Sequence, residues 1–135
     1  MAFAQTLTTQ AKLVALQALA TGTLKMALYT ADADLGAGTL VYSPANEVVG
    51  TGYTAGGNVV TNVTVLTSGT TAYLDFDNVV WNPANFTARG ALIYNTSLGN
   101  LAVAVLDFGS DKTTTTTFTV QTPANTADAA LIRFA

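Results

Sequence analysis

The chain has 135 residues and a formal net charge of −3; half of its residues are apolar and 10% are charged. It contains no Cys and no His, which excludes disulfides, thiolate nucleophiles, Cys/His zinc sites and the usual general base. Its five basic residues disfavour a nucleic-acid surface, and no apolar run reaches transmembrane length. We therefore expect one non-enzymatic domain without metal or cofactor, whose partners are neither nucleic acid nor membrane.

The low charge also bears on assembly, because ordinary soluble domains carry about 25% charged residues. Two explanations fit: partners cover part of the surface, or the exterior is neutral and rich in Thr, Asn and Ser. We favour covered surface slightly, and from it we expect a homo-oligomer.

The first 22 residues are expected to form an arm and a helix ahead of a β domain at residues 23–135. Residues 1–8 have no clear period, which suits an arm that becomes ordered against a neighbour. Residues 9–20 have helical apolar spacing, with Thr8 or Thr9 as N-cap and Gly22 after the end. We expect this helix to pack on the β domain rather than on a partner. The apolar run Leu13–Ala20 has the length of a signal-peptide core, but Gln17 interrupts it and Lys12 is the only positive side chain before it, so we expect it to be part of the mature protein.

Strands are predicted from residue 23 onwards. Residues 23–30 alternate and predict a half-buried strand, whereas residues 32–57 form a long, Gly-rich loop. Residues 59–66 and 71–76 predict two further strands, and a corner follows with Trp81 beneath it.

A central hairpin is predicted next, from the apolar runs at residues 88–94 and 101–108 around a Gly-containing break. A turn at residues 109–112 leads to strands at residues 118–120 and 129–135. The run Thr113–Thr117 is expected to lead into a strand, and on an exposed edge it would pair with another chain.

These elements predict an all-β fold, an antiparallel β-sandwich of about eight strands with one short N-terminal helix. A jelly roll is one candidate topology for such a sandwich. The expected core residues share large apolar side chains in the predicted strands. They are Met26, Leu28, Leu74, Phe76, Trp81, Leu92, Val103, Val105, Phe118 and Leu131.

Candidate chemical sites are few. Asp32 and Asp34 resemble the start of a calcium loop but lack its closing ligands, so an exposed acidic turn is the better interpretation. Asp75 and Asp77 share a strand face, which is a weak signal for acid–base chemistry. Arginine is rarely buried alone, so each Arg inside an apolar strand should pair with a carboxylate or meet an interface. The two are Arg89, with Asp75, Asp77 or Glu47 as candidate partners, and Arg133. The alternative is that each faces outward from a solvated sheet face.

Partner contacts are expected from the loop at residues 32–57, because its apolar residues would be costly to leave in water. The residues chosen for this contact are Val49, Tyr53, Tyr42 and, in the arm, Phe3. The alternative is an ordered loop packed wholly on its own domain.

Several segments resemble small structural proteins of tailed bacteriophages. The resemblance lies in ALYT (residues 27–30), NEVVGTGYTAGG (46–57), FTARGALIYN (86–95) and AVAVLDFG (102–109). It runs from about Lys25 to the C-terminus, does not include the helix, and carries no active-site residues.

The resemblance implies a virion protein, and we expect a capsid decoration (cement) protein on the outer surface of the phage head. Its expected partners are the major capsid protein and copies of itself. The alternatives are a head–tail or tail component, or a carbohydrate-binding module of a host-recognition fibre that uses Tyr42, Tyr53 and Asn46. An enzyme ranks last.

Overall fold

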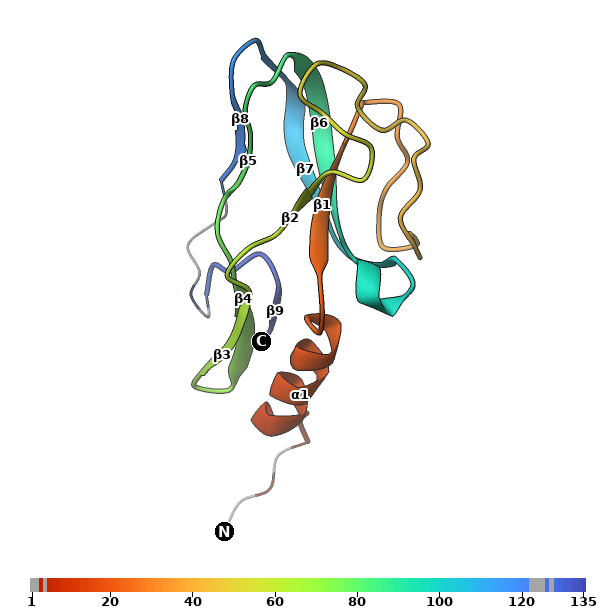
Figure 1. The fold of residues 1–135 in the computed structure, drawn as a ribbon. Helices are drawn as coiled ribbons and strands as arrows, with labels where there is room; N and C mark the ends of the chain where they lie inside the picture. Colours follow the sequence, from red (N-terminus) through yellow and green to blue (C-terminus); the bar gives the residue numbers. More distant parts are fainter. Residues whose placement is uncertain (1–2, 4, 122–125, 127) are drawn as a thin grey trace.

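The computed structural model describes residues 3, 5–121, 126 and 128–135. In this part of the chain, one α-helix, one 3₁₀ turn and nine strands follow one another (Figure 1). Their bounds are α1 (Thr9–Leu19), β1 (Leu24–Tyr29), β2 (Asn58–Val59), β3 (Thr64–Ser68), β4 (Thr71–Asp75), β5 (Val79–Trp81), β6 (Phe86–Asn95), η1 (Thr96–Leu98), β7 (Leu101–Thr114), β8 (Phe118–Val120) and β9 (Arg133–Phe134).

The largest sheet has the strand order β2-β1-β6-β7, and all of its neighbours are antiparallel. The predicted hairpin is confirmed as β6 and β7, joined by η1 where the polar break was expected. Asn95 caps η1 through its side chain, and Gly99 ends it with a φ of 66°, a left-handed conformation that glycine adopts without strain.

The turn expected at residues 109–112 is wrong, because β7 continues through it as a bulged strand. Gly90 pairs with Asp107 and Ala88 with Lys112, so four residues of β7 lie opposite the single residue Arg89. Such a bulge bends and twists an edge strand without ending it. Turn-forming residues at a bulge and at a hairpin end therefore look alike in the sequence.

Two smaller sheets complete the fold, with strand orders β3-β4-β9 and β5-β8. The strand expected at residues 59–66 is split between β2 and β3, because Asn62 adopts a φ of 54° between them. The last expected strand shrinks to β9. The antiparallel all-β fold with one α-helix is confirmed in the described residues, but the strand pairing alone does not define the two layers of the expected sandwich.

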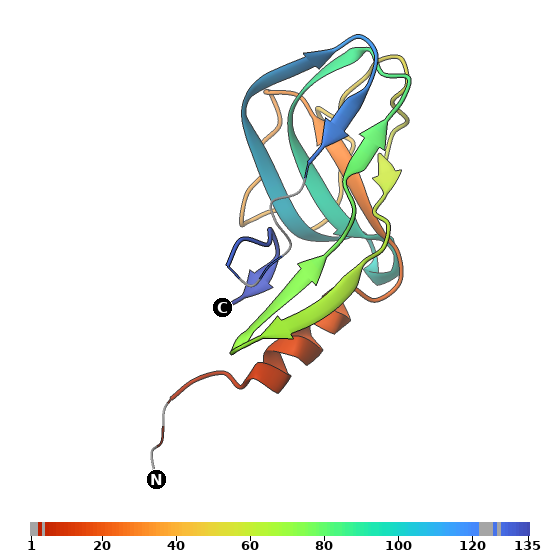
Figure 2. The same cartoon turned by 90° about the vertical axis from the view of Figure 1, so that its left-hand side faces the viewer.

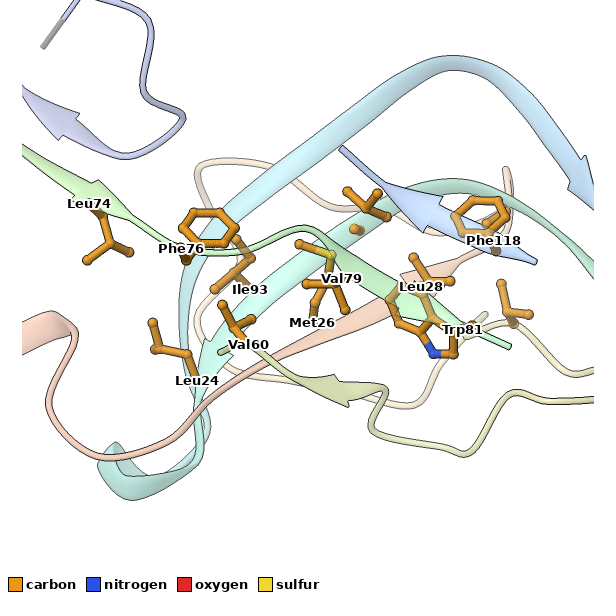
Figure 3. Packing of buried hydrophobic residues seen from close by; sticks show 14 of the residues in the cluster. Leu24, Met26, Leu28, Val60, Leu74, Phe76, Val79, Trp81, Ile93 and Phe118 are labelled. Carbon is orange, nitrogen blue, oxygen red and sulfur yellow. The ribbon is translucent and has the colours of Figure 1, made fainter. Parts of the chain in front are cut away.

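The main core lies between the four-stranded sheet and the two smaller ones (Figures 2 and 3). Leu24, Met26 and Leu28 of β1 all enter this core; Leu28 lies beside Trp81 of β5 at one end, and Leu24 lies beside Val60 at the other. Of the predicted core residues, seven are buried: Met26, Leu28, Leu74, Phe76, Trp81, Leu92 and Phe118.

The opposite face of the large sheet is buried as well, which corrects the half-buried prediction for β1. Ala27 and Tyr29 pack there with Leu92 and Tyr94, because the loop between β1 and β2 folds over them. The loop contributes Leu35 and Tyr42 to this second cluster. When both faces of a strand are covered, the alternation of its residues no longer indicates which face is buried.

Helix α1 packs against β3 and β4 and shares the main core with the strands (Figure 1). Thr8 caps it, its side chain accepting a hydrogen bond from the Ala11 amide, as the sequence predicts. Leu16 is fully buried, and Lys12 is buried too, donating to the carbonyl of Thr70 at 2.7 Å. The long apolar stem of Lys12 makes this burial possible.

Candidate functional site

A buried carboxylate organises the long loop. Glu47 is 7% exposed, and its Oε1 accepts a hydrogen bond from the Tyr42 hydroxyl at 2.6 Å. Its Oε2 accepts from the Tyr53 hydroxyl and from the Gly56 amide, the latter at 2.7 Å. All three donors belong to the same loop, so one side chain joins loop positions from Tyr42 to Gly56.

The tyrosines also tie the loop to the large sheet. The Tyr53 hydroxyl accepts from the Leu28 amide at 2.9 Å, and the Tyr94 hydroxyl donates to the Gly56 carbonyl at 2.6 Å. The ring of Tyr42 stacks on that of Tyr94 with centroids 4.6 Å apart. The loop is therefore held by the strands on which it lies.

The buried setting makes these phenols hard to ionise. Burial raises the pKa of Tyr29 to about 12, and the negative charge of Glu47 acts in the same direction. Burial followed by the hydrogen bond to Glu47 raises the pKa of Tyr42 and of Tyr53. Burial raises the pKa of Tyr94 as well, again with the help of Glu47. All four therefore stay neutral donors at physiological pH.

This arrangement positions the loop, and its carboxylate oxygens are already engaged with three donors. Carboxylates that serve in acid–base catalysis must reach a substrate proton. Here both oxygens face the interior of the loop, so the geometry supports a structural role for Glu47.

The predicted contact residues divide into two pairs. Tyr42 and Tyr53 are partly buried and their hydroxyls bind Glu47. Val49 is 95% exposed and Phe3 is 92% exposed. The loop thus combines the two interpretations offered above: its tyrosines pack on their own domain while Val49 faces outward.

The three residues suggested for carbohydrate binding are engaged elsewhere. Tyr53 packs beside Trp81 and edge-on to Phe86, and Tyr42 lies on Tyr94, so these rings have aromatic neighbours of their own. Asn46 has a φ of 62° and donates through its side chain to the carbonyl of Asp32.

The expected partners of Arg89 are wrong. Its Nε lies 3.2 Å from a carboxylate oxygen of Asp107, across the β6–β7 pair at the bulge, so its ion-pair partner is not Asp75, Asp77 or Glu47. The strand register decides this pairing. The Gly109 amide, followed by Arg89, lowers the pKa of Asp107. Both side chains are exposed, so the pair contributes little to stability.

The remaining charged candidates hold local structure. The Asp77 carboxylate accepts from the side chains of Asn62 and Thr61, at the break between β2 and β3. Arg133 donates to the carbonyl of Asp128. In the described residues, no three Asp or Glu side chains lie close enough together to hold a metal ion, and no helix is long and apolar enough to cross a membrane.

Sequence reasoning missed a groove between β7 and β8. It has a volume of about 690 Å³ and is lined by apolar residues of both strands and by Leu131. Leu131, predicted as core, lines this groove and is only partly buried. Val103 and Val105, also predicted as core, are partly buried on the edge strand β7; Val103 packs on the main core and Val105 on the second cluster. The sequence feature that could have indicated the groove is the Thr-rich run, since Thr113, Thr114 and Thr117 form part of the rim.

No protein-family model, curated protein or solved structure matches the chain.

Proposed function

We propose that this chain is a non-enzymatic structural protein of a tailed-bacteriophage virion, a decoration (cement) protein that binds the outer surface of the head and stabilises its shell. The observation that carries the proposal is Val49, a large apolar side chain 95% exposed on an anchored loop. Its neighbours Glu47 and Val48 are buried, so the backbone that presents Val49 is fixed.

A fixed loop is well suited to binding because little conformational entropy is lost when it docks. Leu40 and Val41, which are also exposed, add apolar surface on the same loop. Apolar side chains at the centre of an interface are worth more than charged ones at its rim. The partner of this loop would be the major capsid protein. The low charge of the chain and its resemblance to phage structural proteins support this choice.

The test is binding of purified protein to heads that lack it, followed by imaging of the particles. We expect copies over the whole head surface, and we expect Val49→Ser to bind more weakly while melting at the same temperature. Val14→Ser is the matched control, because Val14 is exposed on α1 and distant from the loop in sequence.

Two results contradict the proposal. Density confined to the vertex where the tail attaches would instead make the chain a head–tail or tail component. Unchanged binding of the folded Val49→Ser variant would remove the loop from the contact.

A further inference from the structure

The groove between β7 and β8 has the features of an unfilled strand position. Its floor is apolar, formed by Leu106 and Phe108 of β7, Phe118 and Val120 of β8, and Leu131. The rings of Phe108 and Phe118 meet across it with centroids 6.0 Å apart. Its rim carries Thr hydroxyls together with Asp107 and Lys112, so it has no strong net charge.

Both strands beside the groove are edge strands in the described residues. β7 pairs with β6 on one side, and on its other side only its first residues meet the loop, where Val41 bridges Leu101 and the Ala102 amide donates to Leu40. Among the described residues, β8 pairs with β5 alone. Amides and carbonyls along such edges are ready to pair with an added strand.

The arm before α1 has the complementary features. Phe3 is 92% exposed and Leu7 is 57% exposed. The two residues are four positions apart, which places them on the same face of an extended chain. Residues 5–8 have no helical or strand structure and lead away from the strands in both views (Figures 1 and 2). The first charged side chain of the sequence is Lys12, so residues 1–8 carry no charged side chain.

We propose that the arm of one copy binds in the β7–β8 groove of a second copy, as a strand added beside β7. Phe3 and Leu7 would cover the apolar floor, and the arm backbone would pair with the free edge of β7. A volume of about 690 Å³ lies within the range of roughly 300–1,000 Å³ that holds a small organic ligand, enough for an aromatic and an aliphatic side chain.

A second copy is the favoured occupant because residues 5–8 lead away from the strands of their own copy. Each copy has one arm and one groove, so two copies that exchange arms form a closed dimer, and one-way contacts form rings or open chains. This inference does not depend on the proposed function, since it concerns the chain alone.

The decisive experiment uses the absence of Cys from the natural chain. One preparation carries Leu7→Cys and another carries Thr117→Cys, and the two are mixed under oxidising conditions. We expect a disulfide-linked dimer that contains one of each. Val80→Cys, exposed on β5, replaces Thr117→Cys as the control and should not cross-link to Leu7→Cys.

Sedimentation of the full chain gives a second readout. Deleting residues 1–7 keeps the Thr8 cap, and it should weaken self-association by about tenfold or more, as expected for the loss of an aromatic anchor. Added peptide MAFAQTLT should bind this shortened protein, and a peptide with Phe3→Ser and Leu7→Ser should not.

Two outcomes overturn the inference. A chain with both Leu7→Cys and Thr117→Cys that closes only an internal disulfide would show that the arm fills its own groove. Unchanged self-association after the deletion, with no mixed disulfide, would show that the groove does not receive the arm. Neither result depends on binding to phage heads, so this inference and the proposed function fail separately.

Discussion

Glu47 is the only glutamate of the chain, and it is buried among two tyrosine hydroxyls and a backbone amide. A buried carboxylate is tolerated when its oxygens accept several hydrogen bonds, and here neutral donors supply them. From the sequence, Glu47 is predicted only as a candidate partner for Arg89. Glu47 is buried because distant residues of the loop close around it, and such contacts leave no local pattern in the sequence.

Replacing Glu47 by Gln tests this anchor. The amide keeps one acceptor but sets its NH₂ group against the donors that now face Oε1 or Oε2. We expect the free energy of unfolding to fall by about 2–3 kcal/mol, because buried donors lose their partner. Urea unfolding measures the change, and Asp34→Asn, an exposed carboxylate of the same loop, should leave the midpoint unchanged. An unaltered midpoint for Glu47→Gln would contradict the anchor.

The buried tyrosines predict a loss of stability at alkaline pH. In the unfolded chain a tyrosine ionises near pH 10, whereas the pKa of Tyr29 in the folded protein is about 12 and those of Tyr42, Tyr53 and Tyr94 are also raised. A raised folded-state pKa gives stability that is complete below pH 10 and lost as the pH rises towards 12.

Tyrosinate absorbance near 295 nm measures this directly. Folded protein should ionise most of its tyrosines at higher pH than protein in guanidinium, and the unfolding midpoint should drop over the same interval. Overlapping titration curves for the folded and unfolded protein would show that these phenols are not buried as described.

At the scale of single elements, few residues of α1 hold this helix against the strands. Leu16 enters the main core and Lys12 binds the Thr70 carbonyl, while Val14 is 54% exposed. Leu16→Ala should therefore cost about 2–4 kcal/mol of unfolding free energy, the range for a buried leucine. Val14→Ala should change it by less than about 0.5 kcal/mol. Equal effects of the two in thermal denaturation would mean that α1 does not pack on the strands.

The pairing of β1 with β2 depends on a glycine. Gly57 has a φ of +77°, and a Cβ there would lie 1.8 Å from the Met26 carbonyl oxygen. Gly57→Ala should therefore destabilise the fold by more than about 2 kcal/mol, adding a backbone clash to left-handed strain. Gly38→Ala, with open space around it, is the control. Comparable melting temperatures for both variants would contradict the close approach of β2 to β1.

At the scale of the whole molecule, assembly should be driven by apolar contacts. The arm has no charged side chain before Lys12, and the groove carries one acidic and one basic residue at its rim. Salt screens charge pairs but leaves apolar burial intact. Self-association should therefore be unchanged or slightly stronger when NaCl rises from about 50 to about 500 mM. Sedimentation at several protein concentrations measures it, and strong weakening by salt would point to an electrostatic interface.

The sequence by itself determined the local elements. Alternation in Ala72, Leu74 and Phe76, the Thr8 cap and the two runs around residues 96–100 each depend on neighbours within one strand, helix or turn. Local backbone preference and periodicity are readable in such segments, so the helix, the central hairpin and the all-β class were predicted correctly.

Only the tertiary structure decided how these elements meet. It brought Glu47 to its tyrosines, paired Arg89 with Asp107, covered both faces of β1 and left the groove beside β7 open. Each of these depends on strand register or on loop closure between distant residues. Many arrangements satisfy the same local pattern, and the packing of the whole chain selects one of them.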